Sequence, residues 1–504
     1  MDSFSDRLAF SSIANRGRVV CMTRTISASR VATLVGPLSG DERPLYLELA
    51  EGLRLLIGEG RIPAATRMPS ERELTTALGV SRTTVTRAYA ELRDREYAES
   101  RRGSGTVTRL PLHATSVTDR IFAPWSQDPD VVDLNCAAPS APAGVAAAYE
   151  AAVAELPPYL SNHGYYPAGL ARLREVVAET YAERGLPTSP EQIMITSGAL
   201  AGAAVVAQAL TSPGDRVVVE DPVYPNATQA LGHRSARLVP APVDPDGWDL
   251  AATAAIVRQA APRLAYLIPD FQNPTGLVMS DDQRAEYAAA LKRARVTPVV
   301  DEAHQALALD GQAMPAPFAT HSPGAITIGS ASKQFWGGLR LGWLRVPEPM
   351  MPALLQARMS LDLGAPLLEQ LALVHLIENR HAVWAANRER LGRQRDVLLD
   401  ALDTQLPDWT FHRPTGGLAV WCRLPRPRAS ALVAEAERLG VIAAAGRVFA
   451  VEGGLEHFVR LPWTRPADEL ELAVTRLAQA WAVSSSRART GEAARDDSDR
   501  LTVA

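Results

Sequence analysis

The sequence predicts an α/β protein of more than one domain, in which a small helical module precedes a large unit with a buried parallel sheet and a smaller α+β unit. Three observations support this prediction. The chain has 504 residues, whereas single hydrophobic cores usually stop growing near ~250–300 residues. Between residues 144 and 391, apolar β-branched segments alternate with Ala- and Leu-rich segments, which is typical of parallel strands joined by helices. Residues 41–109 instead show helix caps and tight turns.

Composition excludes several classes of protein. Hydrophobic residues make up 47% and charged residues 21% of the chain, as in ordinary globular proteins. With a formal net charge of −4, any binding of nucleic acid has to be local. No apolar run reaches the ~18–20 residues needed to span a bilayer, and we expect no secretory leader. Cys21, Cys136 and Cys422 lack CxxC spacing, so we expect no disulfide framework, no metal site and a cytoplasmic location.

Shifts in composition divide the chain into segments. The expected parts are, in order, a poorly structured extension (1–40), the helical module (41–109), a Pro- and Ala-rich linker (110–143), the large unit (144–391), the small C-terminal unit (392–482) and a disordered tail rich in Ser, Arg and Asp (483–504). The sequence shows no internal repeat.

Residues 70–92 predict two helices joined by a tight turn. Ser70 caps the first helix, Gly79 allows the turn and Ser81 caps the second helix. This order is that of a helix-turn-helix, whose second helix presents side chains to a DNA major groove. The side chains that it would present are those of Arg82, Thr83, Thr84 and Arg87.

A basic hairpin is predicted after the second helix. Arg101 and Arg102 lead into the glycine turn 103–105, which suits a wing on the DNA backbone or minor groove. From Arg82 to Arg109 there are seven arginines against four acidic residues, so positive charge is concentrated where phosphate would be met. The alternative is a solvated helical domain that docks onto the rest of the chain.

Five motifs run in one register from Pro44 to Thr106. They are Pro44-Leu-Tyr46, Gly60-Arg-Ile-Pro63, Arg67-Met-Pro-Ser-Glu-Arg-Glu-Leu74, Gly79-Val-Ser-Arg-Thr-Thr84 and Gly103-Ser-Gly-Thr106. Together they resemble the winged helix-turn-helix of GntR-type regulators. The resemblance implies a double-stranded DNA operator as partner and assigns DNA contacts to Arg72, Ser81, Arg82 and Thr83, with Gly105 shaping the tip of the wing.

One lysine in the large unit points to a cofactor. Lys333 is one of only two lysines in the chain; Ser330 precedes it and Arg340 follows it. A lysine amine can condense with an aldehyde, and the hydroxyl and guanidinium groups can hold a phosphate nearby. Pyridoxal 5′-phosphate (PLP) carries both an aldehyde and a phosphate. For Lys333 taken alone, the ordinary alternative is a surface lysine.

Two loops that follow strands predict further contacts with such a cofactor. Ser197, Gly198 and Ala199 lie between an apolar strand and a helix, where free N–H groups form an anion site. Tyr224 lies in a loop after a strand and can stack on a pyridine ring. Each of these features is also common in turns and packed loops that bind nothing.

Two polar residues complete the predicted set. Asn273 lies in a turn, and its amide can donate to a phenolate oxygen. Asp301 ends the strand 298–300, at the edge of a parallel sheet where ligands gather, and can pair with a pyridine nitrogen. Turn chemistry and helix capping are the alternatives for these two residues.

In order and spacing, these residues resemble the cofactor set of fold-type I aminotransferases over residues 140–480. The resemblance implies that Arg460 clamps a substrate α-carboxylate and that Tyr165, with Tyr166 as the alternative, crosses a dimer interface toward the neighbouring phosphate. His304 departs from the pattern, because these enzymes commonly place a tyrosine there that bonds the phenolate oxygen. A neutral imidazole could still donate there, but the change argues against efficient transamination.

A winged helix-turn-helix ahead of a fold-type I domain resembles the MocR subgroup of GntR-type transcription regulators. This implies a PLP-dependent DNA-binding regulator that senses an amine, an amino acid or PLP itself through an aldimine at Lys333. A homodimer and paired operator half-sites are expected. The alternative is an amino-acid aminotransferase with a regulatory head, since the groups for a half-transamination are present. A PLP-buffering or structural protein would leave Arg460 unexplained.

Overall fold

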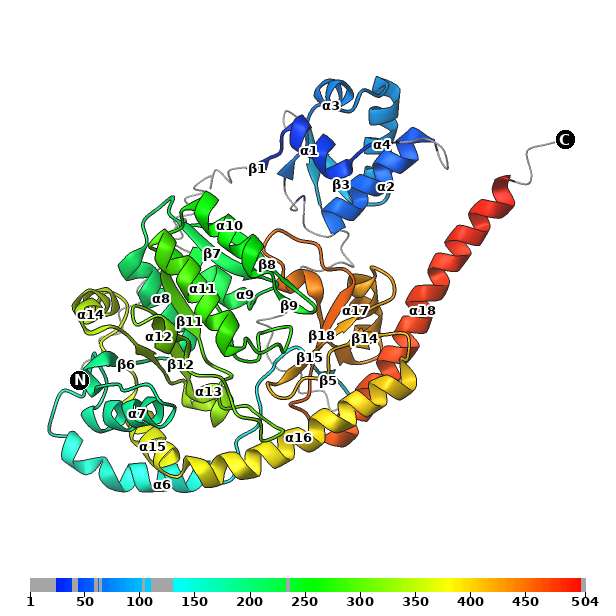
Figure 1. Cartoon of the computed structure of the whole chain (residues 1–504). Helices are drawn as coiled ribbons and strands as arrows, with labels where there is room; N and C mark the ends of the chain where they lie inside the picture. The colour runs from blue at the N-terminus through cyan, green and yellow to red at the C-terminus, as the bar shows by residue number, and fades with distance from the viewer. Residues whose placement is uncertain are drawn as a thin grey trace, which may run out of the picture. The chain divides into compact units, whose positions relative to one another are not determined.

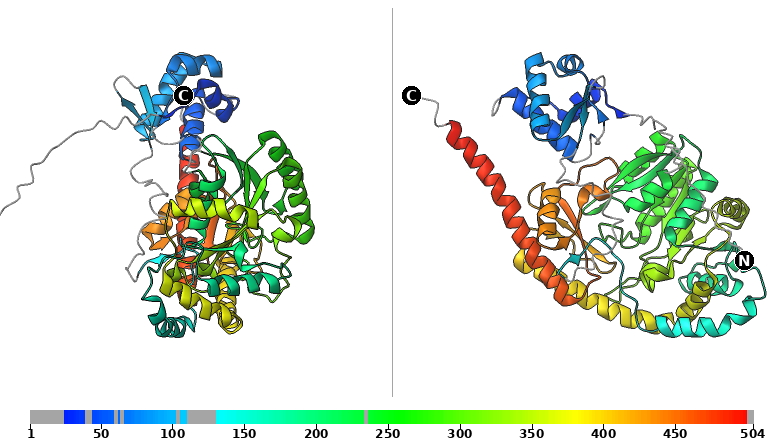
Figure 2. Two further views of the ribbon diagram at one scale, coloured as in Figure 1. Left: turned by 90° about the vertical axis from the view of Figure 1, so that its left-hand side faces the viewer. Right: turned by 180° about the vertical axis from the view of Figure 1, so that it is seen from behind.

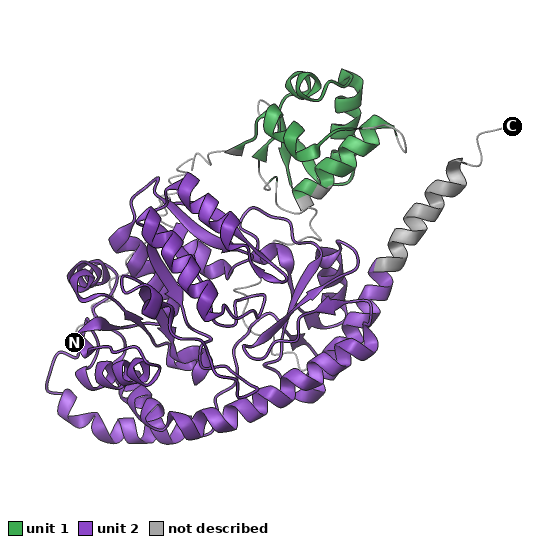
Figure 3. Cartoon of the chain, viewed as in Figure 1, with its two compact units in different colours: residues 1–115 green, residues 116–504 purple. Residues whose placement is uncertain are grey.

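The structure is a computed structural model, and it describes residues 24–38, 44–58, 62, 66–101, 105–109, 130–232 and 236–499. The chain divides into two compact units, Met1–Thr115 and Ser116–Ala504 (Figure 3). Within the described residues, no helix is long and apolar enough to cross a membrane.

The first unit packs short helices around one apolar core. In its described residues the helices are α1 (Ala28–Val35), α2 (Leu45–Gly58), α3 (Glu71–Leu78) and α4 (Arg82–Asp94). A sheet of order β1-β2-β4-β3 joins β1 (Arg24–Thr25), β2 (Thr66–Arg67), β4 (Gly105–Thr108) and β3 (Ala98–Arg101). Leu53, Leu74 and Val85 are fully buried in the core, in which α4 packs against α2 and α3.

The caps and the turn of the helix-turn-helix are those that the sequence indicates. Ser70 and Glu73 form a reciprocal capping box at the start of α3. Gly79 ends α3 in the left-handed region, with φ of 67°. The Ser81 side chain accepts a hydrogen bond from the Thr84 backbone N–H and so caps α4. The structured unit also begins earlier than Asp41, because Ser27 caps α1 and α1 buries Val31.

The second unit contains an eight-stranded sheet in its described residues (Figure 1). In spatial order its strands are β6 (Ile193–Thr196), β13 (Gly342–Arg345), β12 (Ile326–Ser330), β11 (Thr297–Asp301), β10 (Leu264–Leu267), β7 (Arg216–Asp221), β8 (Arg237–Asp244) and β9 (Gly247–Trp248). The strands from β12 to β8 are parallel. By contrast, β13 runs antiparallel to both of its neighbours, and the edge strand β9 runs antiparallel to β8.

Helices cover both faces of this sheet, which explains its near-continuous apolar strands. Val217 and Val219 of β7 enter one core, which also takes apolar residues of α8 (Ala199–Leu210), α9 (Pro225–Gly232) and α14 (Met351–Met359). Val218 enters the other core. That core includes residues of α6 (Val145–Glu155), α7 (Ala171–Glu183), α10 (Leu250–Ala260), α11 (Asp281–Ala294) and α15 (Leu367–Glu378).

A smaller α+β layer continues the second unit (Figure 2). Its sheet has the order β14 (Thr410–Phe411), β15 (Ala419–Arg423), β18 (Phe458–Pro462) and β17 (Ala444–Ala445). Helices α16 (Arg380–Gln405), α17 (Ala429–Arg438) and α18 (Ala467–Asp499) pack with it. The border expected at residue 392 falls inside α16. Helix α18 continues past Val483, where the sequence predicts a disordered tail.

One short strand ties the region expected to be linker into this layer. Strand β5 (Val132–Asp133) pairs in parallel with β16 (Val441–Ile442). The segment after β5 then crosses toward the ends of the central strands. Residues 130–143 of the expected linker are therefore an ordered part of the second unit.

Candidate cofactor site and nucleic-acid interface

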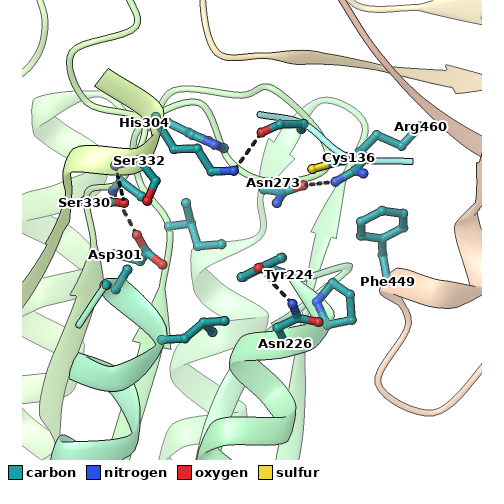
Figure 4. Close-up of a pocket in the computed structure, with 18 of the residues that line it drawn as sticks. Cys136, Tyr224, Asn226, Asn273, Asp301, His304, Ser330, Ser332, Phe449 and Arg460 are labelled. Atoms are coloured by element: carbon teal, nitrogen blue, oxygen red, sulfur yellow. Dashed lines mark hydrogen bonds between the residues drawn. The ribbon is translucent and has the colours of Figure 1, made fainter. Parts of the chain in front are cut away.

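A pocket lies at the carboxyl ends of the parallel strands in the second unit (Figure 4). Most of the residues predicted to bind a cofactor or an effector line it. They are Gly198, Ala199, Tyr224, Asn273, Asp301, His304, Ser330, Lys333, Arg340 and Arg460. Ser197 lies next to this lining in the chain but is not part of it. Tyr165 is 58% exposed and lies outside the pocket.

Lys333 enters the pocket from α13 (Ala331–Gln334), the short helix that directly follows β12. Ser330 caps this helix, and its Oγ accepts from the Ser332 N–H at 3.2 Å. The Nζ of Lys333 donates to the carbonyl oxygen of Ala137 at 2.7 Å. Burial lowers the pKa of Lys333, and this effect outweighs the attraction of Cys136. A larger fraction of the amine is therefore unprotonated, as condensation with an aldehyde requires.

Asp301 is held at the end of β11 by two donors. Its Oδ2 accepts from the Tyr266 hydroxyl at 2.6 Å, and its Oδ1 accepts from the Ala303 N–H at 2.9 Å. Burial raises the pKa of Asp301, whereas the bond from Tyr266 lowers it. Tyr266 is a partner that sequence reasoning missed, since a buried tyrosine on β10 has the pattern of an ordinary core residue.

An anion cradle forms where α8 begins. Gly198 precedes the first turn of α8 with φ of 97°, and no side chain caps the free N–H groups there. A Cβ atom on Gly198 would lie 3.2 Å from the Arg340 guanidinium. Free helix N–H groups beside an arginine form a site for a phosphate. The cradle needs glycine both for its backbone conformation and for this space.

We predict that Gly198→Ala weakens cofactor binding as well as the fold. The backbone of Gly198 (φ 97°, ψ 166°) lies in a region that is essentially restricted to glycine and costs other residues ~1–3 kcal/mol, and the new methyl group presses on Arg340. Gly185→Ala is the matched control, because Gly185 has φ of 78° and no atom within 4 Å of its Cβ position. Calorimetry should show a loss of folding stability for both variants, and the larger loss for Gly198→Ala. A PLP titration should show weaker binding for Gly198→Ala alone, and equal affinity in the two variants would contradict the cradle.

Arg460 approaches the same pocket from β18, and only 5% of it is exposed. Its Nη1 donates to Asn273 Oδ1 at 3.2 Å, and its Nη2 donates to the Asn135 carbonyl. Its Nε has no hydrogen-bond partner among the described residues. Burial lowers the pKa of Arg460 to about 10, which still leaves it charged at neutral pH. A buried guanidinium with a free N–H is a site for a carboxylate.

His304 offers the pocket an acceptor rather than a donor. Its Nδ1 lies 3.0 Å from the Phe271 carbonyl oxygen, which can only accept, so Nδ1 carries the hydrogen. Burial lowers the pKa of His304 to about 4, so the ring is neutral at physiological pH and Nε2 has no hydrogen. The neutral imidazole donates its one N–H to the Phe271 carbonyl. It therefore has no donor left for the phenolate oxygen, the role that the sequence left open.

A segment expected to be linker forms one wall of the pocket. We call Asn135–Ala137 the strap; all three of its carbonyls accept hydrogen bonds from the second unit. Asn226, whose Nδ2 donates to Tyr224 Oη at 3.0 Å, and the ring of Phe449 also line the pocket. No local pattern marks these residues, because tertiary contacts alone bring them to the site.

A buried carboxylate supports the turn that carries Asn273. Glu220 accepts from Trp248 Nε1 at 2.8 Å and from Gln272 Nε2 at 3.1 Å. The Oε1 of Gln272 in turn accepts from the Thr275 N–H at 3.0 Å. Glu220 therefore holds Gln272, and Gln272 holds the turn.

Glu220 should also give the protein a defined pH dependence. Burial raises the pKa of Glu220 to about 7, above the value expected in the unfolded chain. A raised folded pKa stabilises the protein below the unfolded pKa, and this contribution is lost as pH rises through the folded pKa. The unfolding free energy of the wild type, relative to that of Glu220→Gln, should therefore fall by up to ~3 kcal/mol from about pH 5 to about pH 8. Urea unfolding measures it, and exposed Glu150→Gln should show no such trend.

Several of the residues expected to contact DNA are exposed in the first unit. Arg72 is exposed on α3, and Ser81, Arg82 and Thr83 are exposed at the start of α4. The Arg82 side chain is 76% exposed, with Glu71 3.4 Å from its Nε. Thr84 is partly buried, and its Oγ1 lies 2.8 Å from Ser81 Oγ.

The remaining residues of the predicted interface have different surroundings. The Arg87 guanidinium lies 3.9 Å from the centre of the Tyr46 ring, which fixes this side chain on α4. Gly105 begins β4 with φ of 76°. Arg101 ends β3, but its side chain, like all of Arg102, lies outside the described residues.

Two protein families match different parts of the chain. The model of aminotransferase class I and II matches residues 142–477, and the model of bacterial regulatory proteins of the gntR family matches residues 45–107. The uncharacterized HTH-type transcriptional regulator YdcR of Escherichia coli K12 is 30% identical over 76% of this chain and 86% of its own length. The probable rhizopine catabolism regulatory protein MocR of Rhizobium meliloti is 29% identical over 76% of this chain and 82% of its own.

Solved aminotransferases share the fold of the second unit. LysN, an α-aminoadipate aminotransferase from Thermus thermophilus, is 28% identical and has a TM-score of 0.66. The match covers 73% of this chain and 97% of that structure.

Proposed function

Because the chain belongs to the aminotransferase class I and II family and carries a gntR-family DNA-binding domain, as MocR-type transcription regulators do, we propose that it senses an amino acid at the pocket and alters its binding to DNA in response. It is a transcription regulator with a PLP-dependent, aminotransferase-like domain. The lining of the pocket supports an amino acid as the effector.

The residues of the pocket fit PLP. When bound, PLP supplies an aldehyde that joins reversibly to primary amines and a pyridine ring that withdraws electrons. Lys333 is the amine at the site, and the cradle of Gly198 and Arg340 would hold the phosphate. Asp301 would face the ring nitrogen, and Tyr224 would pack on the ring. The glycine-dependent cradle next to Arg340 is the observation on which this fit depends most.

Arg460 supports an amino acid as the effector. Arg460 and Lys333 line one pocket, so a ligand with a primary amine and a carboxylate can engage both residues. An amine without a carboxylate would leave the buried guanidinium incompletely paired. The chain is therefore expected to bind amino acids more tightly than the matching amines.

The strap gives a route from the pocket to the linker. Lys333 donates to the Ala137 carbonyl, Arg460 donates to the Asn135 carbonyl, and Thr464 Oγ1 donates to the Cys136 carbonyl at 3.2 Å. A covalent bond at Lys333 and a carboxylate on Arg460 both compete with these carbonyls. Residues 110–129, which precede the strap, connect it in sequence to the DNA-binding unit. Effector binding would thus shift the strap from one arrangement to another, provided that the effector binds the two arrangements with different affinity.

The second unit is also proposed to form a two-fold dimer. Leu160 and Tyr165 are 69% and 58% exposed, and Leu361 is 53% exposed. A Cβ atom on Gly364 would lie 2.7 Å from the Tyr166 carbonyl oxygen, so the two segments that carry these side chains meet. An exposed apolar patch of this kind marks an interaction surface. A symmetric dimer would pair the DNA-binding units for two operator half-sites.

Arg460→Ala tests the effector assignment. In the PLP-loaded wild type, an amino acid should stabilise the protein and change its affinity for its upstream DNA more than the matching amine does. In the variant, this preference for the carboxylate should disappear, with a loss of roughly 10- to 100-fold in amino-acid affinity. Turnover of an amino acid with a keto acid, combined with no effect on DNA binding, would instead favour the aminotransferase alternative.

A further inference from the structure

We propose that His304 keeps the ring oxygen of the bound cofactor in its protonated, neutral hydroxyl form by accepting a hydrogen bond from it. This inference deepens the proposed function and rests on its assignment of PLP to the pocket. It concerns a residue at which the chain departs from the donor that aminotransferases commonly place there.

The backbone fixes which nitrogen of His304 faces a ligand. The Phe271 carbonyl takes the hydrogen of Nδ1 at 3.0 Å. Only 7% of His304 is exposed, so water cannot readily replace that partner. The neutral ring keeps a lone pair on Nε2, and the residue lines the pocket. His304 therefore presents an acceptor.

The chemistry of PLP places its hydroxyl beside the aldehyde. On the pyridine ring, the carbon that bears the aldehyde lies between the carbon with the hydroxyl and the carbon with the phosphate arm, and the ring nitrogen lies opposite. The aldehyde is assigned to Lys333, the phosphate to the cradle and the ring nitrogen to Asp301. Of the other polar side chains that line the pocket, we assign Asn273 and His304 to the hydroxyl, whereas Asn226 pairs with Tyr224.

Asn273 and His304 together match a hydroxyl group. The Oδ1 of Asn273 accepts from Arg460 Nη1 at 3.2 Å, so its Nδ2 remains as a donor. One donor from Asn273 and one acceptor from His304 pair with a hydroxyl, which both accepts and donates. A phenolate oxygen can only accept, and it would leave its lone pairs facing the lone pair of Nε2. The pair of side chains therefore favours the protonated oxygen.

The position of this proton affects the reactivity of the site. A proton held on the ring oxygen is not on the nitrogen joined to the cofactor, and no proton is gained or lost overall. Attack by an incoming amine is faster when that nitrogen is protonated, so His304 should slow the exchange of amines. Slow exchange suits a sensor better than a catalyst. The charged and titratable side chains that share the pocket with His304 are Lys333, Arg340, Arg460, Asp301, Tyr224 and Cys136.

Absorbance of the full-length, PLP-loaded protein tests the proposal without any measurement of activity. With the proton on the oxygen, the bound cofactor of the wild type should absorb mainly in the near ultraviolet at neutral pH. His304→Tyr offers a donor in place of the acceptor and should move the absorbance into the visible. The pH at which the bound cofactor loses this proton should fall by about one unit or more, because a donor stabilises the phenolate that is left.

A second variant and a fold control keep the test decisive. His304→Gln can also donate and should shift the spectrum in the same direction, and circular dichroism reports whether each variant is folded. A wild-type spectrum dominated by the visible band, with the same pH midpoint in a folded donor variant, would overturn the role of His304 and leave the proposed function intact. Absence of bound cofactor from the wild type would overturn both.

Discussion

Lys333→Ala is expected to abolish the covalent attachment of PLP and the spectral response of the protein to added amino acids. Lys333 provides the amine of the pocket, and alanine has no group that can join an aldehyde. Borohydride reduction followed by mass spectrometry measures attachment directly. The wild type should gain one cofactor per chain, and the variant none. The variant should also lose any effect of amino acids on DNA binding.

Lys292→Ala is the matched control for this experiment. Lys292 is the other lysine of the chain and is exposed on α11, outside the pocket. This variant should bind PLP as the wild type does. Attachment that survives Lys333→Ala, or that is lost in Lys292→Ala, would show that the covalent site has been misplaced.

Arg82→Ala is expected to weaken operator binding by roughly 10- to 100-fold, or ~1–3 kcal/mol, the range for one base-contacting arginine. Arg82 is the first residue of α4, and its side chain is largely exposed at the end of the helix that would enter the major groove. Fluorescence anisotropy at one fixed salt concentration measures the affinity, because salt changes it strongly.

Arg95→Ala provides the control for lost charge. Arg95 caps the opposite end of α4 and pairs there with Glu91 and Glu51. Its replacement removes the same charge and should change operator affinity much less than Arg82→Ala does. Equal losses for the two variants would mean that the start of α4 does not read the DNA.

The parts of the fold that depend on neighbours in sequence could be predicted. The apolar runs 216–220 and 298–301 correspond closely to β7 (Arg216–Asp221) and β11 (Thr297–Asp301), because strands buried on both faces need continuous apolar sequence. The caps at Ser70 and Ser81 likewise follow from local hydrogen bonding. In contrast, the antiparallel insertion of β13 between β6 and β12 depends on long-range pairing, of which a single strand carries no signal.

The candidate site also has some features that could be predicted from neighbours in sequence and others that depend on long-range contacts. The strand-end Asp301 and the helix-start Gly198 could be identified because their chemistry follows from their local positions. The contacts of the strap and the donor from Tyr266 to Asp301 could not, since these groups are far apart in sequence. The direction of the His304 ring depends on the carbonyl of Phe271, 33 residues earlier, so sequence alone could not decide between donor and acceptor.

Occupancy at Lys333 and Arg460 is proposed to control binding to DNA. The most direct measurement is the affinity of the full-length protein for its upstream DNA with PLP, with and without an amino acid, in the wild type and in Lys333→Ala. The wild type should show a change of about tenfold, within the ~1–3 kcal/mol usual for allosteric coupling, and Lys333→Ala none. An equal change in both proteins, or no change in the wild type across a broad set of amino acids, would contradict the claim.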